Sequence, residues 1–254
     1  MKWDKIFFYV KNGRQEQVFS KRVDAKNLIN KRFNYKKDSK ELFILIPPWG
    51  GTIKLNFFLR KYLLKNGYSL LEYEFPEAIL SSNWKFTLSH FNKINNLIIE
   101  DIKKFKKKYK FEKINIVGIS LGGVISCKIA NNNLILNKMC LIVPGHCLAE
   151  SMWKGISTQN LKRNYQSQGI TLKELKTYWK SLAPENNVSK LKVKKINIFL
   201  SKNDIVIPYY CGKILLTKIK SSHYNLLCQV NNSLGHYLTI FSFYLNPKKF
   251  LFHK

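Results

Sequence analysis

Residues 114–123 constrain the fold of this chain more than any other stretch. Residues 114–117 form a short apolar run rich in β-branched side chains, which is typical of a buried strand. Residues 118–122 follow with the pattern G-x-S-x-G around Ser120, and the apolar run 124–130 is typical of a helix. A serine on such a tight turn is expected to be strained, with its oxygen at the positive end of the helix. The pentapeptide alone also fits a Gly/Ser turn that caps a helix.

An acid and a base follow the serine in a suggestive order. Serine chemistry needs a base that takes the hydroxyl proton and an acid that orients the base. Asp204 is the only aspartate after Ser120, and it directly follows a predicted strand. His236 follows a strand and opens a helix, whereas His223 begins a strand and His253 lies in the tail. We therefore predict that Ser120, Asp204 and His236 meet at one edge of the sheet. Taken singly, Asp204 also fits a turn and His236 a helix cap.

Apolar runs alternate with helical patterns along most of the chain. Strands are predicted at 41–46, 68–75, 114–117, 138–143, 195–200 and 224–230, and helices at about 53–66, from a cap at Ser89, at 124–130 and at 237–245. This alternation predicts an α/β fold with a mostly parallel, doubly wound sheet of about eight strands and helices on both faces. An opening hairpin is expected at 5–10 and 17–20, around Asn12-Gly13. No linker is visible, so residues 1–254 are expected to form one domain.

Residues 147–194 interrupt this alternation between two predicted strands. Their aromatic side chains are mixed with many lysines, and Leu172 and Leu175 suggest a helix; the aromatic residues are Trp153, Tyr165, Tyr178 and Trp179. An insertion on the side where the strands end is placed to act as a lid, and a peripheral helical decoration is the alternative. His146, just before the insertion, is placed to line a pocket without a catalytic role.

The net charge of +29 raises the question of a nucleic-acid partner. Arginine supplies most bidentate base and phosphate contacts, and only 5 of the 44 basic residues are arginine. The lysines are spread along the whole chain, so we do not expect nucleic-acid binding. The densest run, at 103–110, fits either the solvated end of a helix or a patch for an anionic partner.

The cysteines and the distribution of apolar residues indicate the cellular compartment. The five cysteines include no C-x-x-C pair and lie mostly in apolar segments, which favours buried free thiols in a reducing compartment. The apolar run at 6–10 is too short for a signal peptide, and no apolar run approaches 18 residues. The expectation is a cytoplasmic protein without a transmembrane segment.

Together, these features resemble the α/β-hydrolase fold superfamily, in particular its esterase, lysophospholipase and serine-aminopeptidase-like branch. The likeness spans about residues 40–250 and is carried by the loop 47–51, the turn 118–122, Asp204 and His236. It implies an acyl-enzyme mechanism in which Ser120 attacks a carbonyl, His236 takes the proton and Asp204 holds the imidazole. It requires no metal ion and no organic cofactor.

The resemblance also implies an oxyanion hole formed by two backbone amides. Leu121, which follows the serine, supplies one of them. Alignment of the loop 47–51 on its glycines favours Trp49 for the other, with Gly50 as second choice. Here Pro47-Pro48 replaces the usual His-Gly start of this loop, and a plain strand-to-helix turn is the alternative.

The predicted activity is therefore that of a serine hydrolase, carboxylesterase-like, which cleaves a small-molecule carboxylic ester or thioester. An acyltransferase with the same triad and a non-catalytic binding protein on this fold are the alternatives. The aromatic, lysine-bearing insertion would suit an apolar acyl chain with a negative group nearby. The sequence specifies neither the substrate nor an oligomeric state.

Overall fold

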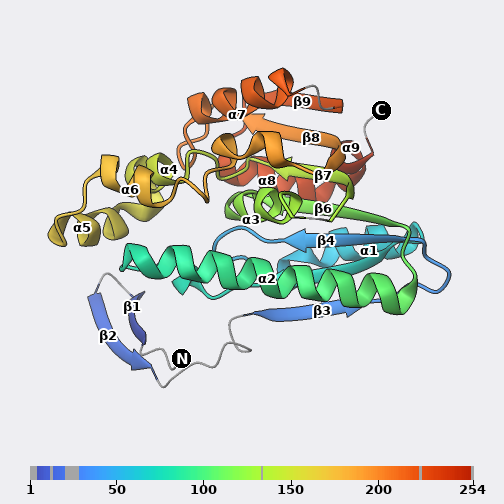
Figure 1. Cartoon of the computed structure of the whole chain (residues 1–254), viewed down its shortest axis with the longest axis horizontal. Helices are drawn as coiled ribbons and strands as arrows, with labels where there is room; N and C mark the ends of the chain where they lie inside the picture. Colours follow the sequence, from blue (N-terminus) through green and yellow to red (C-terminus); the bar gives the residue numbers. More distant parts are fainter. Residues whose placement is uncertain (1–4, 12–13, 21–28, 133, 223–224, 253–254) are drawn as a thin grey trace.

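A seven-stranded sheet forms the centre of the computed structural model, which describes residues 5–11, 14–20, 29–132, 134–222 and 225–252 (Figure 1). Its strands are β3 (Asn30–Asn34), β4 (Glu41–Ile46), β5 (Ser69–Glu74), β6 (Lys113–Ile119), β7 (Leu136–Ile142), β8 (Val193–Ser201) and β9 (Asn225–Asn231). Their order is β3-β5-β4-β6-β7-β8-β9. All neighbours pair in parallel except β3, which is antiparallel to β5 at the edge. The mostly parallel sheet is confirmed, with seven strands in place of about eight.

The predicted N-terminal hairpin forms a separate two-stranded sheet. Strand β1 (Lys5–Lys11) pairs antiparallel with β2 (Arg14–Ser20), and Lys11 lies opposite Arg14. The expected turn residues Asn12 and Gly13 lie outside the described residues.

Helices cover both faces of the large sheet, because its strands carry apolar side chains on both sides. One face packs against α2 (Trp84–Tyr109), α3 (Leu121–Ala130) and α7 (Tyr209–Ser221), and the other against α1 (Phe57–Lys65), α8 (His236–Leu245) and α9 (Pro247–Leu251). Along β4, Leu42 and Ile44 belong to the core on the face covered by α2, α3 and α7, whereas Phe43 and Leu45 belong to the core on the opposite face. Figure 1 shows α2 and α3 together in front of the sheet. The predicted layers are therefore confirmed.

Helix α2 begins earlier than predicted. Its N-cap is Asn83, whose side chain accepts a hydrogen bond from the backbone N–H of Lys85 at 3.0 Å. Ser89, the predicted cap, lies inside the helix. The first turn contributes few buried apolar side chains, so the apolar repeat that marks the helix starts later than the helix itself.

Residues 147–194 form helices between β7 and β8. These are α4 (Leu148–Lys154), α5 (Gln159–Ser167) and α6 (Leu172–Tyr178), with short 3₁₀ turns at Ile156–Thr158, Pro184–Asn186 and Val188–Lys190. Tyr165 and Trp179 are fully buried in the main core, and Tyr178 stacks on Trp84 with ring centroids 3.8 Å apart. The aromatic residues of the insertion thus anchor it to the rest of the molecule.

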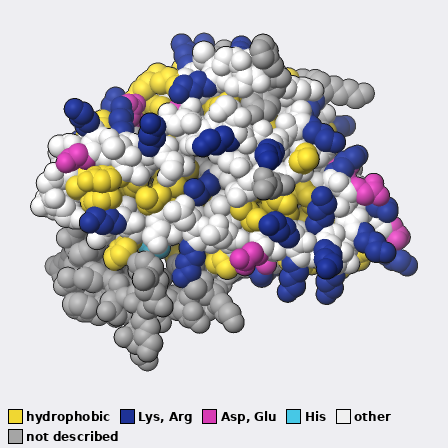
Figure 2. All heavy atoms as spheres, in the orientation of Figure 1, with side chains coloured by type: hydrophobic (Ala, Val, Ile, Leu, Met, Phe, Trp, Pro, Cys, Tyr) yellow, Lys and Arg dark blue, Asp and Glu magenta, His cyan; other side chains and the backbone are white. Residues whose placement is uncertain are grey.

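Basic side chains are scattered over the face shown in Figure 2, among apolar and neutral ones. The lysine run occupies the exposed C-terminal end of α2, where positive charge suits the helix dipole.

Two further 3₁₀ turns, Ile53–Asn56 and Glu77–Ile79, complete the connections that follow β4 and β5. Among the described helices, none combines the length and apolar composition needed to cross a bilayer.

Candidate active site

Ser120 lies on a strained turn between β6 and α3. Its backbone dihedrals are φ 50° and ψ −119°, a region that residues with a Cβ atom rarely adopt. Such a turn needs glycine on either side. A Cβ atom on Gly118 would lie 2.4 Å from Ser126 Oγ, and one on Gly122 would lie 2.3 Å from the carbonyl oxygen of Ile46. The G-x-S-x-G spacing is therefore required by close packing as well as by the turn.

His236 and Asp204 lie beside this serine. Ser120 Oγ is 3.0 Å from His236 Nε2, and His236 Nδ1 is 2.7 Å from Asp204 Oδ2. His236 is the first residue of α8, and Asp204 follows β8. The side chains of His236 and Asp204 are 3% and 4% exposed, so bulk water screens their interaction weakly. Of the other predicted histidines, His223 and His253 lie outside the described residues.

The hydrogen bonds set the orientation of the imidazole ring. An ionised carboxylate only accepts, so Nδ1 of His236 must donate to Asp204. In the neutral ring this leaves Nε2 as an acceptor for the hydroxyl of Ser120. The remaining oxygen of Asp204, Oδ1, accepts from the backbone N–H groups of Val206 and Ile207 at 2.8 and 2.7 Å. All three donors on the carboxylate therefore hold it in place.

Contacts between two loops fix the separation of the acid and the base. Lys202 N donates to the carbonyl of Asn231 at 2.9 Å, and the side-chain amide of Asn203 donates to the carbonyl of Asn232 at 3.0 Å. Ser201 Oγ also donates to the carbonyl of Leu234. These bonds join the loop that follows β8 to the loop that precedes α8.

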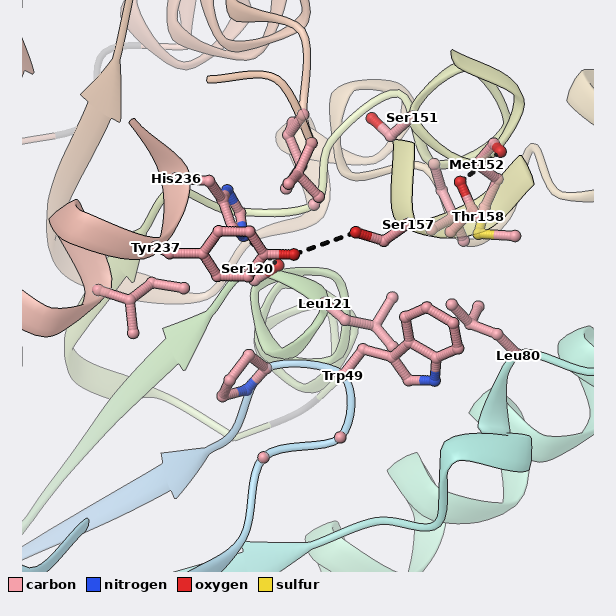
Figure 3. Close-up of a pocket in the computed structure, with 18 of the residues that line it drawn as sticks. Trp49, Leu80, Ser120, Leu121, Ser151, Met152, Ser157, Thr158, His236 and Tyr237 are labelled. Carbon is pink, nitrogen blue, oxygen red and sulfur yellow. Dashed lines mark hydrogen bonds between the residues drawn. The ribbon is translucent and has the colours of Figure 1, made fainter. Parts of the chain in front are cut away.

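A cavity of about 280 Å³ opens at Ser120 (Figure 3). It is surrounded by the loops after β4, β5, β7 and β8, the start of α3, the insertion and α8. Its lining residues are Pro48, Trp49, Gly50, Gly51, Leu55, Leu80, Ser120, Leu121, Gly145, Leu148, Ser151, Met152, Ser157, Thr158, Val206, Ile207, His236, Tyr237, Ile240 and Tyr244. Five of these, from Leu148 to Thr158, come from the insertion.

The lining of this cavity lacks the positive charge that was expected from the lysines of the insertion. No lysine, arginine, aspartate or glutamate is among the described residues that line the cavity. The lysines of the insertion therefore do not supply a site for a negative group there. Figure 3 shows the hydroxyl groups of Ser157 and Tyr237 meeting across the cavity, 3.0 Å apart.

His146 does not line the cavity, contrary to the expectation from sequence. It is 2% exposed, and its Nδ1 is buried without a hydrogen-bond partner among the described residues. Burial lowers the pKa of His146 to about 3, while Asp204 raises it and His236 lowers it further. The imidazole is therefore neutral and packs behind the site.

Trp49 and Leu121 both line the cavity next to Ser120. Gly51 N donates to the carbonyl of Pro48 at 3.0 Å, and Gly50 has φ +69° in this turn. The turn leaves the amides of Trp49 and Gly50 outside its own hydrogen bond. The side chain of Trp49 is held separately: its indole N–H donates to the carbonyl of Glu77 at 2.7 Å, which fixes the ring at the cavity wall.

Sequence reasoning missed most of the cavity wall. Val206 follows Asp204, and Ile240 and Tyr244 follow His236, but their apolar character is equally typical of a core. Only their proximity to Asp204 and His236 in the sequence could have indicated them.

The sheet order and the position of the serine turn define an α/β-hydrolase fold, and solved structures with this fold align with most of the chain. An acylaminoacyl peptidase from Pyrococcus horikoshii has a TM-score of 0.66 at 14% identity, over 94% of this chain and 43% of the peptidase. An esterase from Pyrococcus furiosus has a TM-score of 0.60 at 14% identity, over 91% and 94% of the two chains. An acetyl xylan esterase from a Paenibacillus species has a TM-score of 0.63 at 12% identity, over 85% and 79%. This chain spans less than half the length of the peptidase.

The chain belongs to the uncharacterised protein family UPF0227, whose profile matches residues 80–251. The matched segment includes Ser120, Asp204 and His236 and begins after Trp49. No curated protein sequence matches the chain at a significant level.

Proposed function

We propose that this protein is a serine hydrolase that cleaves a carboxylic ester or thioester through an acyl-enzyme. One observation carries the proposal: Ser120, His236 and Asp204 form a continuous line of hydrogen bonds, and its serine end opens into a cavity. A serine hydroxyl is a weak nucleophile unless a base accepts its proton. The acceptor nitrogen of His236 is in place to do this.

In the proposed reaction, Ser120 Oγ attacks the substrate carbonyl and His236 Nε2 takes the hydroxyl proton. The resulting imidazolium is stabilised by Asp204, which already accepts from Nδ1. His236 then donates its proton to the leaving alcohol or thiol, and the acyl group remains on the serine. Water, deprotonated by the same imidazole, hydrolyses the acyl-enzyme and restores Ser120.

The proposed oxyanion hole consists of the backbone amides of Leu121 and Trp49. Two observations support it. Both residues line the cavity beside Ser120, and the lack of a side chain on Gly122 lets the start of α3 approach the carbonyl oxygens of Ile46 and Pro47 closely. This contact brings the loop after β4 next to the amide that follows the serine. Donors fixed in this way stabilise negative charge without reorganisation.

The size and lining of the cavity favour a neutral, apolar acyl group. A cavity of about 150 Å³ lined by aliphatic side chains is sufficient to bind benzene. The cavity at Ser120 measures about 280 Å³ and is lined by side chains such as Leu148, Met152 and Ile240. The proposed substrate is therefore an ester or thioester with a short to medium aliphatic or aromatic acyl group.

Residues 147–194 act as a cap on this single-domain protein in the proposed function. Their contribution of Leu148 and Met152 to the cavity supports this role. The cap is attached to the start of α2 and to the loop before it. Tyr165 donates its hydroxyl to the carbonyl of Ser81 at 2.6 Å, and the indole of Trp179 donates to the carbonyl of Trp84 at 3.1 Å. The hydrogen bond between Ser157 and Tyr237 joins this cap to α8 beside the cavity.

Labelling with a fluorophosphonate tests this proposal, because the probe reacts with an activated serine. Wild-type protein should be labelled rapidly at Ser120, and Ser120→Ala and His236→Ala should both lose the label. Ser167→Ala, which removes an exposed hydroxyl on α5, is the matched control and should react like the wild type. A well-folded wild-type protein that is not labelled would contradict the proposal. Product analysis with an added alcohol then separates hydrolysis from acyl transfer.

A further inference from the structure

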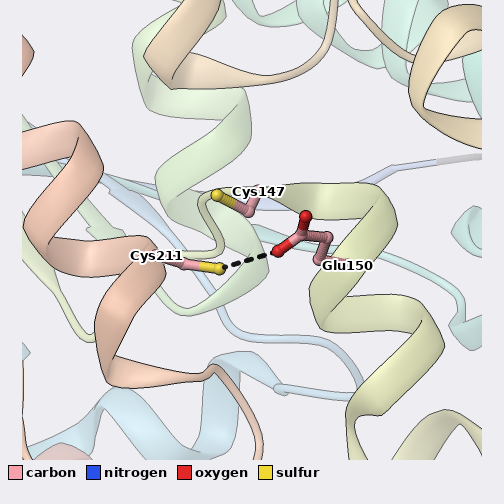
Figure 4. A group of neighbouring side chains, drawn as sticks. All are labelled: Cys147, Glu150 and Cys211. Atoms are coloured by element: carbon pink, nitrogen blue, oxygen red, sulfur yellow. Dashed lines mark hydrogen bonds between the residues drawn. The ribbon is translucent and has the colours of Figure 1, made fainter. Parts of the chain in front are cut away.

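Two thiols and a carboxylate meet between α4 and α7, outside the Ser120 cavity (Figure 4). Cys147 is the residue before α4, Glu150 lies in the first turn of α4, and Cys211 lies in the first turn of α7. One ligand atom from each residue lies within 4.8 Å of the other two. Cys211 is fully buried and Cys147 is 8% exposed, so both thiols are largely shielded from solvent. We refer to these three residues as the thiol cluster.

Neighbouring groups orient the carboxylate of Glu150 towards the thiols. Lys176 from α6 donates to Oε1, whereas Tyr210 donates to Oε2. Cys211 Sγ lies 3.8 Å from the same Oε2. Burial alone would raise the pKa of Glu150, but the hydrogen bonds from Lys176 and Tyr210 hold it below its usual value. The carboxylate is therefore ionised, with one oxygen held by a cation and the other directed at a thiol.

The backbone at Cys147 also has a fixed and uncommon conformation. Its φ of 46° and ψ of 52° lie in the left-handed region, which a residue with a Cβ atom seldom adopts. Its N–H donates to Glu185 Oε2 at 3.0 Å. This bond holds the chain in the conformation that places the thiol opposite Cys211.

The geometry points to a binding site for a thiophilic divalent cation, with Zn²⁺ as the best match, formed by Cys147 Sγ, Cys211 Sγ and Glu150 Oε2. Zinc prefers tetrahedral sites of this kind, with Zn–S bonds of about 2.3 Å and Zn–O bonds of about 2.0–2.2 Å. The hydroxyl of Tyr210, or a water that replaces it, completes the coordination. Lys176 remains on Oε1, as expected for a group that orients a metal-binding carboxylate from outside.

Charge and proton balance are consistent with this site. Two Zn–S bonds form as two S–H bonds break, and both protons leave to solvent. The two thiolates and Glu150 then carry three negative charges, which one divalent cation and the Lys176 ammonium neutralise. Because the metal binds the thiolates and their protons are released, binding strengthens as the pH rises.

The bound cation would join the insertion to the core. Cys147 and Glu150 belong to the insertion, whereas Cys211 belongs to the helix that follows the Asp204 loop. Leu148 and Ile207, next to these elements, line the Ser120 cavity. The metal would therefore fix one side of the cavity wall, without taking part in the reaction.

The test uses full-length, reduced, chelator-treated protein titrated with Co²⁺ and then Zn²⁺. Co²⁺ should bind with one-to-one stoichiometry and give thiolate-to-cobalt charge-transfer absorption, which Zn²⁺ should abolish. Zn²⁺ should release two protons per site and raise the melting temperature. Cys147→Ser and Cys211→Ser should each weaken metal binding by roughly tenfold or more. Glu150→Gln should also weaken metal binding, although the side chain keeps nearly the same volume. Cys228→Ser, on β9 and outside the cluster, should bind like the wild type.

Three outcomes would overturn the inference. The first is no stoichiometric binding by reduced wild-type protein, and the second is equal loss of binding in Cys228→Ser. The third is a Cys147–Cys211 disulfide, found by peptide mapping after mild peroxide treatment, in a protein that takes up no metal when reduced. Glu150→Gln keeps the test decisive if a cysteine variant fails to fold. None of these readouts depends on hydrolase activity.

Discussion

Ser120 Oγ and His236 Nε2 lie 3.0 Å apart, although 116 residues separate them in the sequence. Three features of the chain produce this contact. The turn at Ser120 lifts its side chain from the end of β6, α8 begins with His236 directly after its N-cap residue Gly235, and Asp204 fixes the ring from the other side. The contact is therefore a property of three loops at one edge of the sheet, where α/β folds place their sites.

Replacement of the serine tests its role most directly. Ser120→Ala should lower kcat for an activated ester by roughly four to six orders of magnitude, because it removes the proposed nucleophile. The melting temperature should change little, since the side chain makes a single hydrogen bond. Ester hydrolysis and thermal unfolding measure the two effects. Retention of most of the activity by Ser120→Ala, next to an active Ser167→Ala control, would refute the assignment.

The acid can be tested without loss of its loop. Asp204→Asn keeps an oxygen for the N–H groups of Val206 and Ile207 but presents an amide N–H₂ to His236. The ring must then turn its acceptor nitrogen towards this amide and its N–H towards Ser120. We expect kcat to fall on the order of 10⁴-fold with a smaller change in KM. Steady-state kinetics check this, and an Asn variant with near-normal kcat would show that Asp204 has no such role.

Much of the site's framework could be predicted because it is encoded locally. Strand β4 matches its predicted bounds, and the glycines around Ser120 are visible in any reading of the sequence. The chain order of Ser120, Asp204 and His236 added the long-range information. The turn at Ser120 could be predicted from its residue types alone, although the contact of Gly122 with the carbonyl oxygen of Ile46, which also requires a glycine there, is tertiary.

Other features depend on tertiary contacts that leave no periodic pattern. Strand β3 has exposed and half-buried side chains and is stabilised by antiparallel pairing with β5, so its sequence has no apolar alternation. The thiol cluster joins Cys147 and Cys211 from distant segments, with no spacing that marks a metal site. His146 was expected at the cavity, but a histidine in the loop after β7 can face either the cavity or the core.

The glycines offer a test of the close packing behind Ser120. Gly122→Ala would place a methyl group 2.3 Å from a backbone oxygen of β4, which cannot move without disturbing the sheet. We expect a loss of roughly 3 kcal/mol in the free energy of unfolding. Gly67→Ala is the matched control, since a Cβ there meets no atom within 4 Å and only its φ of +83° is unfavourable. That variant should lose about 1–2 kcal/mol. Chemical denaturation measures both, and equal losses would contradict the packing argument.

The proposed cap can be tested through the acyl group that the cavity is proposed to accept. Met152 is 3% exposed and lines the cavity from α4. Met152→Trp should fill part of the space, so kcat/KM for p-nitrophenyl octanoate should fall roughly tenfold or more relative to p-nitrophenyl acetate. Ser167→Trp adds the same side chain on the exposed side of the insertion and should leave the ratio unchanged. An unchanged ratio in Met152→Trp would place the acyl group elsewhere.

His146 makes stability depend on pH in a defined direction. Its pKa is about 3 in the folded protein, chiefly because of burial, and about 6.5 in the unfolded chain. Between these values the unfolded chain binds the extra proton, so stability is complete above about pH 6.5 and falls as the pH is lowered towards 3. The contribution approaches about 1.4 kcal/mol per pH unit within this window. His146→Gln should therefore show a flatter dependence of unfolding free energy on pH, even if it is less stable at neutral pH. Denaturant titrations of both proteins between pH 4.5 and 7 measure how the unfolding free energy changes below the ordinary histidine pKa of about 6.5. Parallel curves would mean that the imidazole is protonated in the folded state as readily as in the unfolded one.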